Sequence, residues 1–204
     1  MNTTAKKPRV AFQGERGAFS EEAALNLLGP EIELVPRRTF ADLYDSLDND
    51  VADYVLAPVE NSIAGLVKPS VELLNSKTFT VRNEIQIKIE QHLIGCPGAS
   101  FEAIETVQSH PTALAQCSRF FETNPQLQRL VADDTAGSVA EIIRRGDPKR
   151  AAIAGQRAAD LYGAIIIRKS IQDHSENYTR FVLLSAQSEQ RLEPPTLEVK
   201  EYAS

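Results

Sequence analysis

The chain has 204 residues, of which 42% are hydrophobic and 25% charged, and its 22 basic and 28 acidic residues give a formal net charge of −6. This composition is typical of a globular protein and excludes a disordered, collagen-like or disulfide-framed chain. Binding of nucleic-acid phosphates needs a stripe of basic residues, and a membrane helix needs about 20 apolar residues in a row. The sequence has neither, so we expect no nucleic-acid partner and no membrane span.

Strands and helices are predicted to alternate from the first residues. The first predicted strands are short apolar runs that end at a Gly, a Pro or a polar cluster, and they cover residues 9–13, 32–35 and 54–59. After the first strand we expect a helix with Ser20 as its N-cap, because Glu21 and Glu22 follow in its first turn. The second strand is expected to close at Pro36, before a helix capped by Thr39.

The middle of the chain predicts a long strand followed by a second lobe. Residues 84–90 alternate strictly between apolar and polar side chains, which indicates a strand with one solvated face. This strand continues through 93–95, and a strand of that length can cross between two lobes. Beyond it we expect three strand-to-helix units, at 106–121, 127–145 and 150–162.

Two further apolar strands, 165–167 and 181–184, flank a polar loop at 172–177. Apolar strands do not end a chain in solvent, so we expect both to return to the first lobe. The tail 186–204 has adjacent prolines and no apolar period, as a linker does. The predicted fold is therefore α/β, with two α/β lobes around a cleft. Their expected ranges are about 8–80 plus 164–185 for lobe 1 and about 81–163 for lobe 2.

Four strands end in small polar clusters at or just before a helix start, at residues 14–20, 60–62, 109–112 and 133–136. Ligands of open α/β sheets bind beyond the carboxyl ends of the strands, and free N–H groups at helix starts favour anions. Each cluster taken alone is ordinary helix capping. Together, on two lobes, the clusters predict a site for a small anion.

We expect no cofactor and no metal. Gly14 and Gly17 do not have the dinucleotide-binding spacing, and no P-loop lysine follows them. The histidines have no second ligand at a metal-binding spacing. Cys96 and Cys117 are expected to be reduced, buried thiols. The N-terminal residues carry charge with no apolar segment behind them, so we expect a cytoplasmic protein.

The segment 177–181 places a hydroxyl, a guanidinium and an aromatic ring at the mouth of a buried strand. A charge is costly there unless an anion pairs with it. A second interpretation is that Arg180 forms a salt bridge with a neighbouring carboxylate at a strand edge.

With these motifs the chain resembles the catalytic domain of prephenate dehydratase over about Val10 to Ser185. The resemblance is carried by ordered blocks at compatible spacings, within residues 13–20, 58–65, 109–117, 135–136, 151–163 and 171–181. It implies a catalytic domain over 1–185 with a two-lobed fold similar to type II periplasmic binding proteins. It also implies conversion of prephenate to phenylpyruvate, water and carbon dioxide in phenylalanine biosynthesis.

Such a decarboxylative elimination needs a proton donor at the departing hydroxyl, a cradle for the substrate's anionic groups and a dry pocket. Thr179 matches the threonine that is essential in this family. We expect the Thr179 hydroxyl to position and polarise the leaving hydroxyl. Glu60 is a candidate proton donor on condition that its carboxyl is buried. The catalytic residues that the resemblance implies are Thr179, Glu60 and Asn61. The implied substrate-binding residues are Ser20, Ser62, Ser109, His110, Thr135, Ala136, Asn177, Arg180 and Phe181.

Two alternatives stay open at this point. Arogenate dehydratase performs the same elimination on the amino analogue of prephenate, and a non-catalytic module of the same fold would bind a small anion without turnover. The resemblance also implies a homodimer, because dimers are usual in the family. Many members continue into a phenylalanine-binding ACT domain, and this sequence ends at Ser204 without one, so we expect no feedback control in cis.

Overall fold

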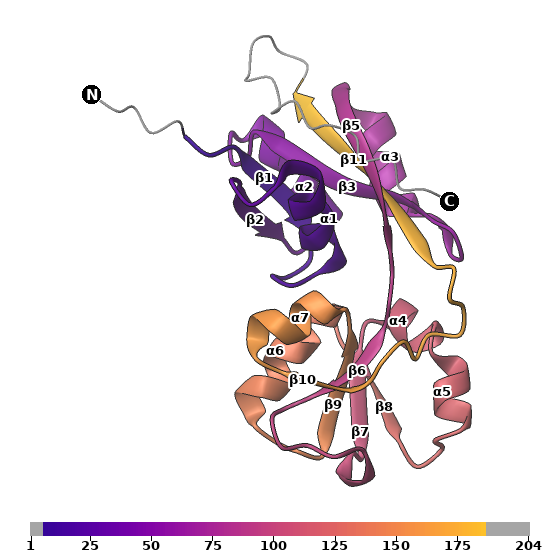
Figure 1. Ribbon diagram of the computed structural model, residues 1–204. Helices are drawn as coiled ribbons and strands as arrows, with labels where there is room; N and C mark the ends of the chain where they lie inside the picture. The colour runs from indigo at the N-terminus through magenta and orange to yellow at the C-terminus, as the bar shows by residue number, and fades with distance from the viewer. Residues whose placement is uncertain (1–5, 187–204) are drawn as a thin grey trace.

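The computed structural model describes residues 6–186. Within this range the chain forms two lobes, each built on its own sheet, with one lobe above the other in Figure 1. The fold class predicted from the alternation of strands and helices is therefore confirmed. Of the predicted tail, Ala186 ends a strand and residues 187–204 lie outside the described residues.

The first lobe has a mixed sheet with helices on both faces. Its strands are β1 (Arg9–Gln13), β2 (Glu33–Arg37), β3 (Tyr54–Asn61), β4 (Gly65–Leu66), β5 (Phe79–Lys88) and β11 (Tyr178–Ala186). Its helices are α1 (Phe19–Leu28), α2 (Phe40–Asp48) and α3 (Lys68–Ser76). The strand order is β2-β1-β3-β11-β5, with β4 paired to β3. Strand β1 runs parallel to β2 and β3, and β11 runs antiparallel to β3 and β5.

The second lobe has a five-stranded sheet in the order β10-β6-β9-β7-β8. Its strands are β6 (His92–Gly95), β7 (Thr106–Ser109), β8 (Gln128–Val131), β9 (Arg150–Ala154) and β10 (Ile165–Arg168). Its helices are the 3₁₀ turn η1 (Phe101–Ala103), α4 (Pro111–Ala115), α5 (Ser118–Glu122), α6 (Thr135–Arg145) and α7 (Gln156–Tyr162). Strand β7 is parallel to β8 and β9, and β6 is antiparallel to β9 and β10.

Each sheet buries apolar side chains on both faces. In the first lobe, Leu27 of α1 packs with Leu56 and Leu183 on one face, and Leu43 of α2 packs with Val55 on the other. In the second lobe, α6 and α7 cover one face and α4 and α5 the other. Burying one such aliphatic side chain contributes about 1.5–3 kcal/mol to the stability of the fold. Each lobe therefore has its own core, which fixes the positions of the strand ends.

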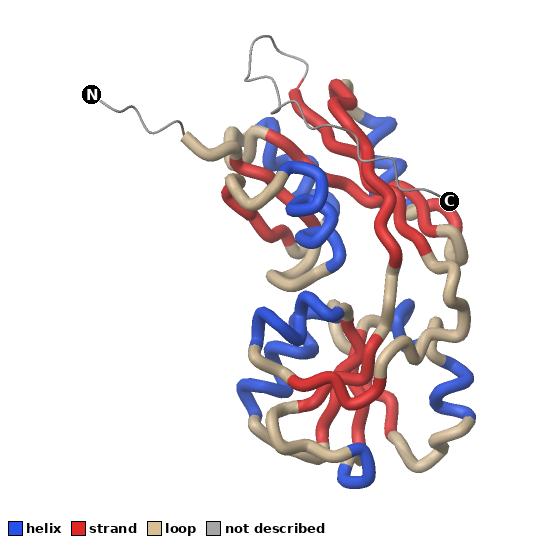
Figure 2. Tube along the Cα trace, in the orientation of Figure 1, coloured by secondary structure: helices blue, strands red, loops and turns tan. Residues whose placement is uncertain are grey.

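The chain crosses between the lobes in two segments, drawn as tan tubes between the red strands in Figure 2. The first joins β5 to β6, so the chain crosses where predicted, but residues 89–91 interrupt the continuous strand that was expected. The second joins β10 to β11. The two segments pair with each other: Ile89 N–H donates to Asn177 O at 2.7 Å, and Ile171 N–H donates to Gln91 O at 2.8 Å.

The predicted lobe boundaries are wrong at both crossings. Strand β5 pairs with β11 along its length, so residues 81–88 belong to the first lobe. Strand β10 pairs with β6, so 165–168 belong to the second lobe instead of returning to the first. Alternation along a strand shows which face is solvated but carries no information about which sheet the strand joins.

Several predicted element ends also shift. Ser20 is not an N-cap, because α1 begins at Phe19 and Ser20 lies buried in its first turn. Strand β2 runs through Pro36, which an edge strand tolerates because a missing N–H faces away from the sheet. The predicted helix 111–121 is divided into α4 and α5, because the Asp173 carboxylate accepts from the N–H groups of Ser118 and Arg119 and starts a new helix. The predicted cap Thr39 is confirmed, since it accepts from Asp42 N–H.

Both cysteines are free and buried, as expected. Burial, with a contribution from nearby Asp173, raises the pKa of the Cys117 thiol to about 12. Since the thiolate is the reactive form, we expect Cys117 to be alkylated by iodoacetamide at pH 8 at least tenfold more slowly in the native protein than in urea. Peptide mass spectrometry measures both rates, and equal rates would contradict the buried position.

Candidate active site

Asn61, the last residue of β3, connects two distant parts of the chain. Its side chain is almost fully buried. The Nδ2 group donates to Asn177 Oδ1 at 2.7 Å, to Tyr178 O at 3.1 Å and to Thr179 Oγ1 at 3.0 Å. These contacts follow from the sheet register, which places Thr179 of β11 directly opposite Asn61. One amide therefore organises the start of β11.

The carbonyl side of the same amide shapes the turn that follows β3. Asn61 Oδ1 accepts from Ile63 N–H at 3.0 Å and from Ala64 N–H at 2.9 Å. An Asn side chain that accepts from the backbone a few residues ahead replaces a backbone turn bond. Both ends of the Asn61 amide are thus fixed, so its Nδ2 is held toward Asn177 and Thr179.

Two hydrogen-bond donors at this point have no acceptor among the described residues. Thr179 Oγ1 accepts from Asn61, and among residues 6–186 its own hydroxyl hydrogen meets no acceptor. Asn177 is fully buried, and its Nδ2 has no partner among the described residues. Buried polar groups are nearly always hydrogen-bonded. We define Asn61, Asn177 and Thr179 as the amide cluster, and it presents two donors suited to an oxygen atom.

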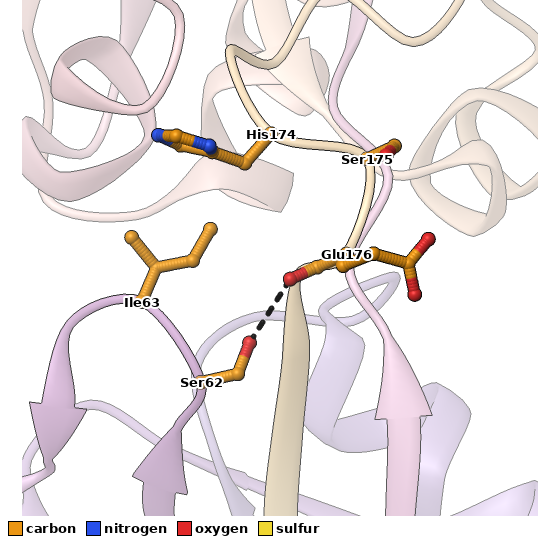
Figure 3. A pocket seen from close by; sticks show the side chains of 5 residues that line it. All are labelled: Ser62, Ile63, His174, Ser175 and Glu176. Carbon is orange, nitrogen blue, oxygen red and sulfur yellow. Dashed lines mark hydrogen bonds between the residues drawn. The ribbon is translucent and has the colours of Figure 1, made fainter.

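A cavity of about 380 Å³ is lined by residues that follow Asn61 and precede Asn177 in the sequence. Figure 3 shows the residues that line it: Ser62, Ile63, His174, Ser175 and Glu176. They come from the turn after β3 and from the loop that leads into β11. Ser62 joins the two sides, since its Oγ donates to Glu176 O at 3.2 Å and accepts from Tyr178 N–H at 2.9 Å. The His174 ring lies over the Ile63 side chain, and the Glu176 carboxylate points away from both.

Glu60 and Arg180 lie outside the amide cluster. Each is next in sequence to a cluster residue, and alternation along a strand sends neighbouring side chains to opposite faces. Arg180 Nη2 contacts Glu60 Oε2 at 3.2 Å, and Arg180 Nη1 contacts Glu84 Oε2 at 3.3 Å. The interpretation of Arg180 as a salt-bridged strand residue is confirmed. The condition attached to Glu60 as a proton donor is not met, because half of its side chain is exposed.

The second-lobe residues expected at the site start or precede helices. Ser109 ends β7, is fully buried and donates to Ile153 O at 2.6 Å. His110 Nδ1 accepts from Thr112 N–H at 3.2 Å as the cap of α4. Thr135 is the first residue of α6, and Ala136 behind it is buried in the core. The structure describes no contact between these residues and the amide cluster.

Phe181 and Ser20 are both buried, and Phe181 packs with Leu56 and Ile87 in the first-lobe core. Phe181 is therefore a core residue. The sequence analysis missed Ile63, His174, Ser175 and Glu176 as cavity residues. The polar loop at 172–177 was a signal for them, but only its pairing with the turn after β3 makes it part of a site.

No group of three or more metal-ligating side chains gathers among the described residues. Within the same range, no helix has both the length and the apolar character that crossing a membrane requires.

Comparison with protein families identifies the chain. The family model described as prephenate dehydratase matches residues 10–189. The chain belongs to the prephenate dehydratase family. Members of this family are lyases that act on prephenate or arogenate.

Curated relatives carry both substrate names. The chain is 36% identical over 177 residues to arogenate dehydratase/prephenate dehydratase 2 of Arabidopsis thaliana, covering 87% of this chain and 46% of that protein. It is 34% identical over 181 residues to the bifunctional chorismate mutase/prephenate dehydratase of Aquifex aeolicus, covering 88% and 49%. The chain spans about half the length of the curated relatives it matches.

Solved structures agree on the fold. Prephenate dehydratase from Arthrobacter aurescens, solved in complex with L-Phe, superposes with a TM-score of 0.81 at 24% identity, over 90% of this chain and 63% of that one. GqqA, described as a novel type of quorum quenching acylase, superposes with a TM-score of 0.78 at 30% identity, over 89% and 65%. The expected cytoplasmic location and homodimer stay predictions.

Proposed function

We propose that this chain is a prephenate dehydratase, with arogenate as the alternative substrate. The observation that carries the proposal is the amide cluster, in which Thr179 Oγ–H and Asn177 Nδ2 are two donors without a partner among the described residues, while the residues next to Asn61 and Asn177 in the sequence line a cavity. The family match supports it, because members of the family eliminate a ring hydroxyl from such a substrate.

The reaction breaks two bonds. The bond from the ring to its carboxylate breaks and releases carbon dioxide, and the electron pair moves through the ring as the bond from carbon to the hydroxyl oxygen breaks. That oxygen gains negative charge until it takes a proton and leaves as water. Donors already aimed at an oxygen where charge develops are the main way that proteins lower such barriers.

Thr179 and Asn177 are assigned to that oxygen. The Asn61 amide occupies a lone pair of Thr179 Oγ1, so the Thr179 hydroxyl hydrogen is free to donate to a ligand oxygen. Asn177 Oδ1 is held by Asn61, so its Nδ2 is presented in the same way. A threonine hydroxyl is a weak acid, so these groups position and polarise the leaving oxygen, and the proton comes from another donor.

Prephenate and arogenate differ at the side chain, as a keto group or an amine, and not at the leaving hydroxyl. The amide cluster therefore fits both. The proposal of prephenate over arogenate rests on the resemblance of the chain to the prephenate dehydratase catalytic domain.

The test incubates the purified protein with prephenate and arogenate in parallel. We expect prephenate to give phenylpyruvate, read as the absorbance of its enolate in alkali, at a rate well above that of the buffer alone. If only arogenate is converted, giving phenylalanine that is measured by chromatography, the chain would be assigned as an arogenate dehydratase instead. Prephenate binding by calorimetry without product from either substrate would overturn the enzymatic proposal in favour of a binding module.

A further inference from the structure

Glu21, in the first turn of α1, is a fully buried carboxylate that the reaction proposed above does not use. It accepts from Arg16 Nε at 2.6 Å, from Gly17 N–H at 3.0 Å and from Arg157 Nε at 2.9 Å. Burial by itself would raise the pKa of Glu21, but the hydrogen bonds from Arg16, Arg157 and Gly17 outweigh it and lower the pKa below its ordinary value. Glu21 is therefore an ionised group with donors on several sides.

Two of these donors come from the first lobe and one from the second. Arg16 and Gly17 lie in the loop before α1, whereas Arg157 lies in α7, 136 residues from Glu21 along the chain. Breaking one partner from a buried ion pair leaves an uncompensated charge and is strongly destabilising. Glu21 thus links the two lobes through groups that cannot separate without exposing a charge.

The backbones of the two lobes also approach closely here. A Cβ on Gly17 would lie 3.0 Å from Ala158 Cα, and a Cβ on Gly155 would lie 2.7 Å from the Phe19 ring. Gly17 has a φ of +87°, a left-handed conformation that glycine adopts without strain. The contact between the lobes therefore explains both Gly17 and Gly155.

Further contacts extend this interface. Tyr162 Oη donates to Arg16 O at 2.8 Å. Phe12 and Ala18 of the first lobe share one buried apolar cluster with Ile94 and Ala154 of the second. We call this interface the seam; its residues are Phe12, Arg16, Gly17, Ala18, Phe19 and Glu21 on one side and Ile94, Ala154, Gly155, Arg157, Ala158 and Tyr162 on the other. Figure 1 shows the loop before α1 directly above α7.

The lobes are therefore joined in two ways. The crossing segments at 89–91 and 169–177 connect them covalently, and they lie beside the amide cluster, since Asn177 is itself part of the second one. The seam connects them through side chains of α1 and α7. Two lobes joined only by a pair of extended segments are free to hinge, so the seam decides how far apart their facing surfaces stand.

We propose that Glu21 is a positioning residue, which holds α1 against α7 so that the first-lobe amide cluster and the second-lobe helix starts keep the separation that turnover requires. The expected effect of Glu21 on turnover rests on the proposed function, whereas its expected effect on the distance between the lobes does not. Misplacement of reacting groups by about 1 Å can cost a reaction up to about 100-fold, which makes a fixed separation valuable.

The first experiment measures the distance between the lobes without substrate. Spin labels on Asn49→Cys and Glu102→Cys, both exposed and one on each lobe, give a distance distribution by double electron–electron resonance. We expect one narrow distribution for the parent protein and a longer or broader one for Glu21→Gln. The control is Glu72→Gln, which makes the same change at an exposed position of α3, outside the seam. An unchanged distribution in Glu21→Gln would overturn the proposal.

The second experiment is a double-mutant cycle. Glu21→Gln and Arg157→Gln are each expected to lower kcat/KM about tenfold, and the double variant is expected to be no slower than either single one, because both remove the same link. Additive losses, about 100-fold in the double variant, would contradict the proposal. In Arg157→Gln the Glu21 carboxylate keeps Arg16 and Gly17 N–H as donors, so we expect this variant to fold, and unfolding midpoints verify this. If the parent protein turns over neither substrate, the proposed function fails while the distance measurement still decides the role of Glu21.

Discussion

Thr179→Val is expected to lower the turnover of prephenate by about 100-fold or more, the usual scale for loss of a positioned proton-transfer group. Valine keeps the branched shape that suits β11 and removes only the hydroxyl. The leaving oxygen then loses one of the two donors of the amide cluster. Asn61 Nδ2 keeps Asn177 Oδ1 and Tyr178 O as acceptors, so the loss in stability stays near 1 kcal/mol. The measurement is kcat with prephenate, beside an unfolding curve.

The matched control for this variant is Thr179→Ser. Serine retains the hydroxyl that accepts from Asn61 and donates toward the ligand, so we expect it to keep most of the activity. Turnover within a few-fold of the parent protein in Thr179→Val would remove the hydroxyl from the mechanism. Loss of activity in the serine variant to the same level as in valine would indicate a packing role for the residue.

Asn61→Asp is expected to abolish turnover to a similar degree by a different route. The aspartate has the same shape, and one carboxylate oxygen still accepts from Ile63 N–H and Ala64 N–H, so the turn after β3 survives. The other carboxylate oxygen takes the place of Asn61 Nδ2, so an acceptor stands where the amide had a donor. It takes the Thr179 hydroxyl hydrogen for itself, and the donor meant for the leaving oxygen is lost.

The same change should also destabilise the protein by about 1–3 kcal/mol, because a buried charge now faces the carbonyl oxygen of Tyr178. Kinetics and urea unfolding measure the two effects separately. The control is Asn26→Asp, which adds the same charge at an exposed position of α1 and should change neither quantity by much. An Asn61→Asp protein with normal kcat would show that the direction of the amide is irrelevant to the reaction.

Local signals explain most of what the sequence predicted about the fold. The apolar runs, the cap at Thr39 and the alternation at 84–90 each depend on neighbours a few residues away, and the structure confirms the strands and helices they indicate. The sequence analysis missed the helix α3, although its Val71 and Leu74 pack against the first-lobe core. Element ends shifted where a distant residue decided them, as Asp173 did at the start of α5.

The candidate site divides in the same manner. The sequence motifs placed Asn61, Asn177 and Thr179 among the functional residues through their resemblance to a family, and the structure brings all three together. They also placed Glu60 and Arg180 there, and the structure puts both on the opposite face of the sheet. A difference of one position along a strand reverses the direction of a side chain, so motif membership alone does not say which residues face a ligand.

The sequence by itself determined the order and type of most elements, the crossing from β5 to β6 and the family to which the chain belongs, because these depend on local composition and ordered motifs. Only the tertiary structure decided the sheet that β10 joins, the amide cluster and the seam. Asn61 and Asn177 are 116 residues apart, and Glu21 and Arg157 are 136 residues apart. Contacts at such separations are set by strand register and by the packing of one lobe on the other, which no local pattern contains.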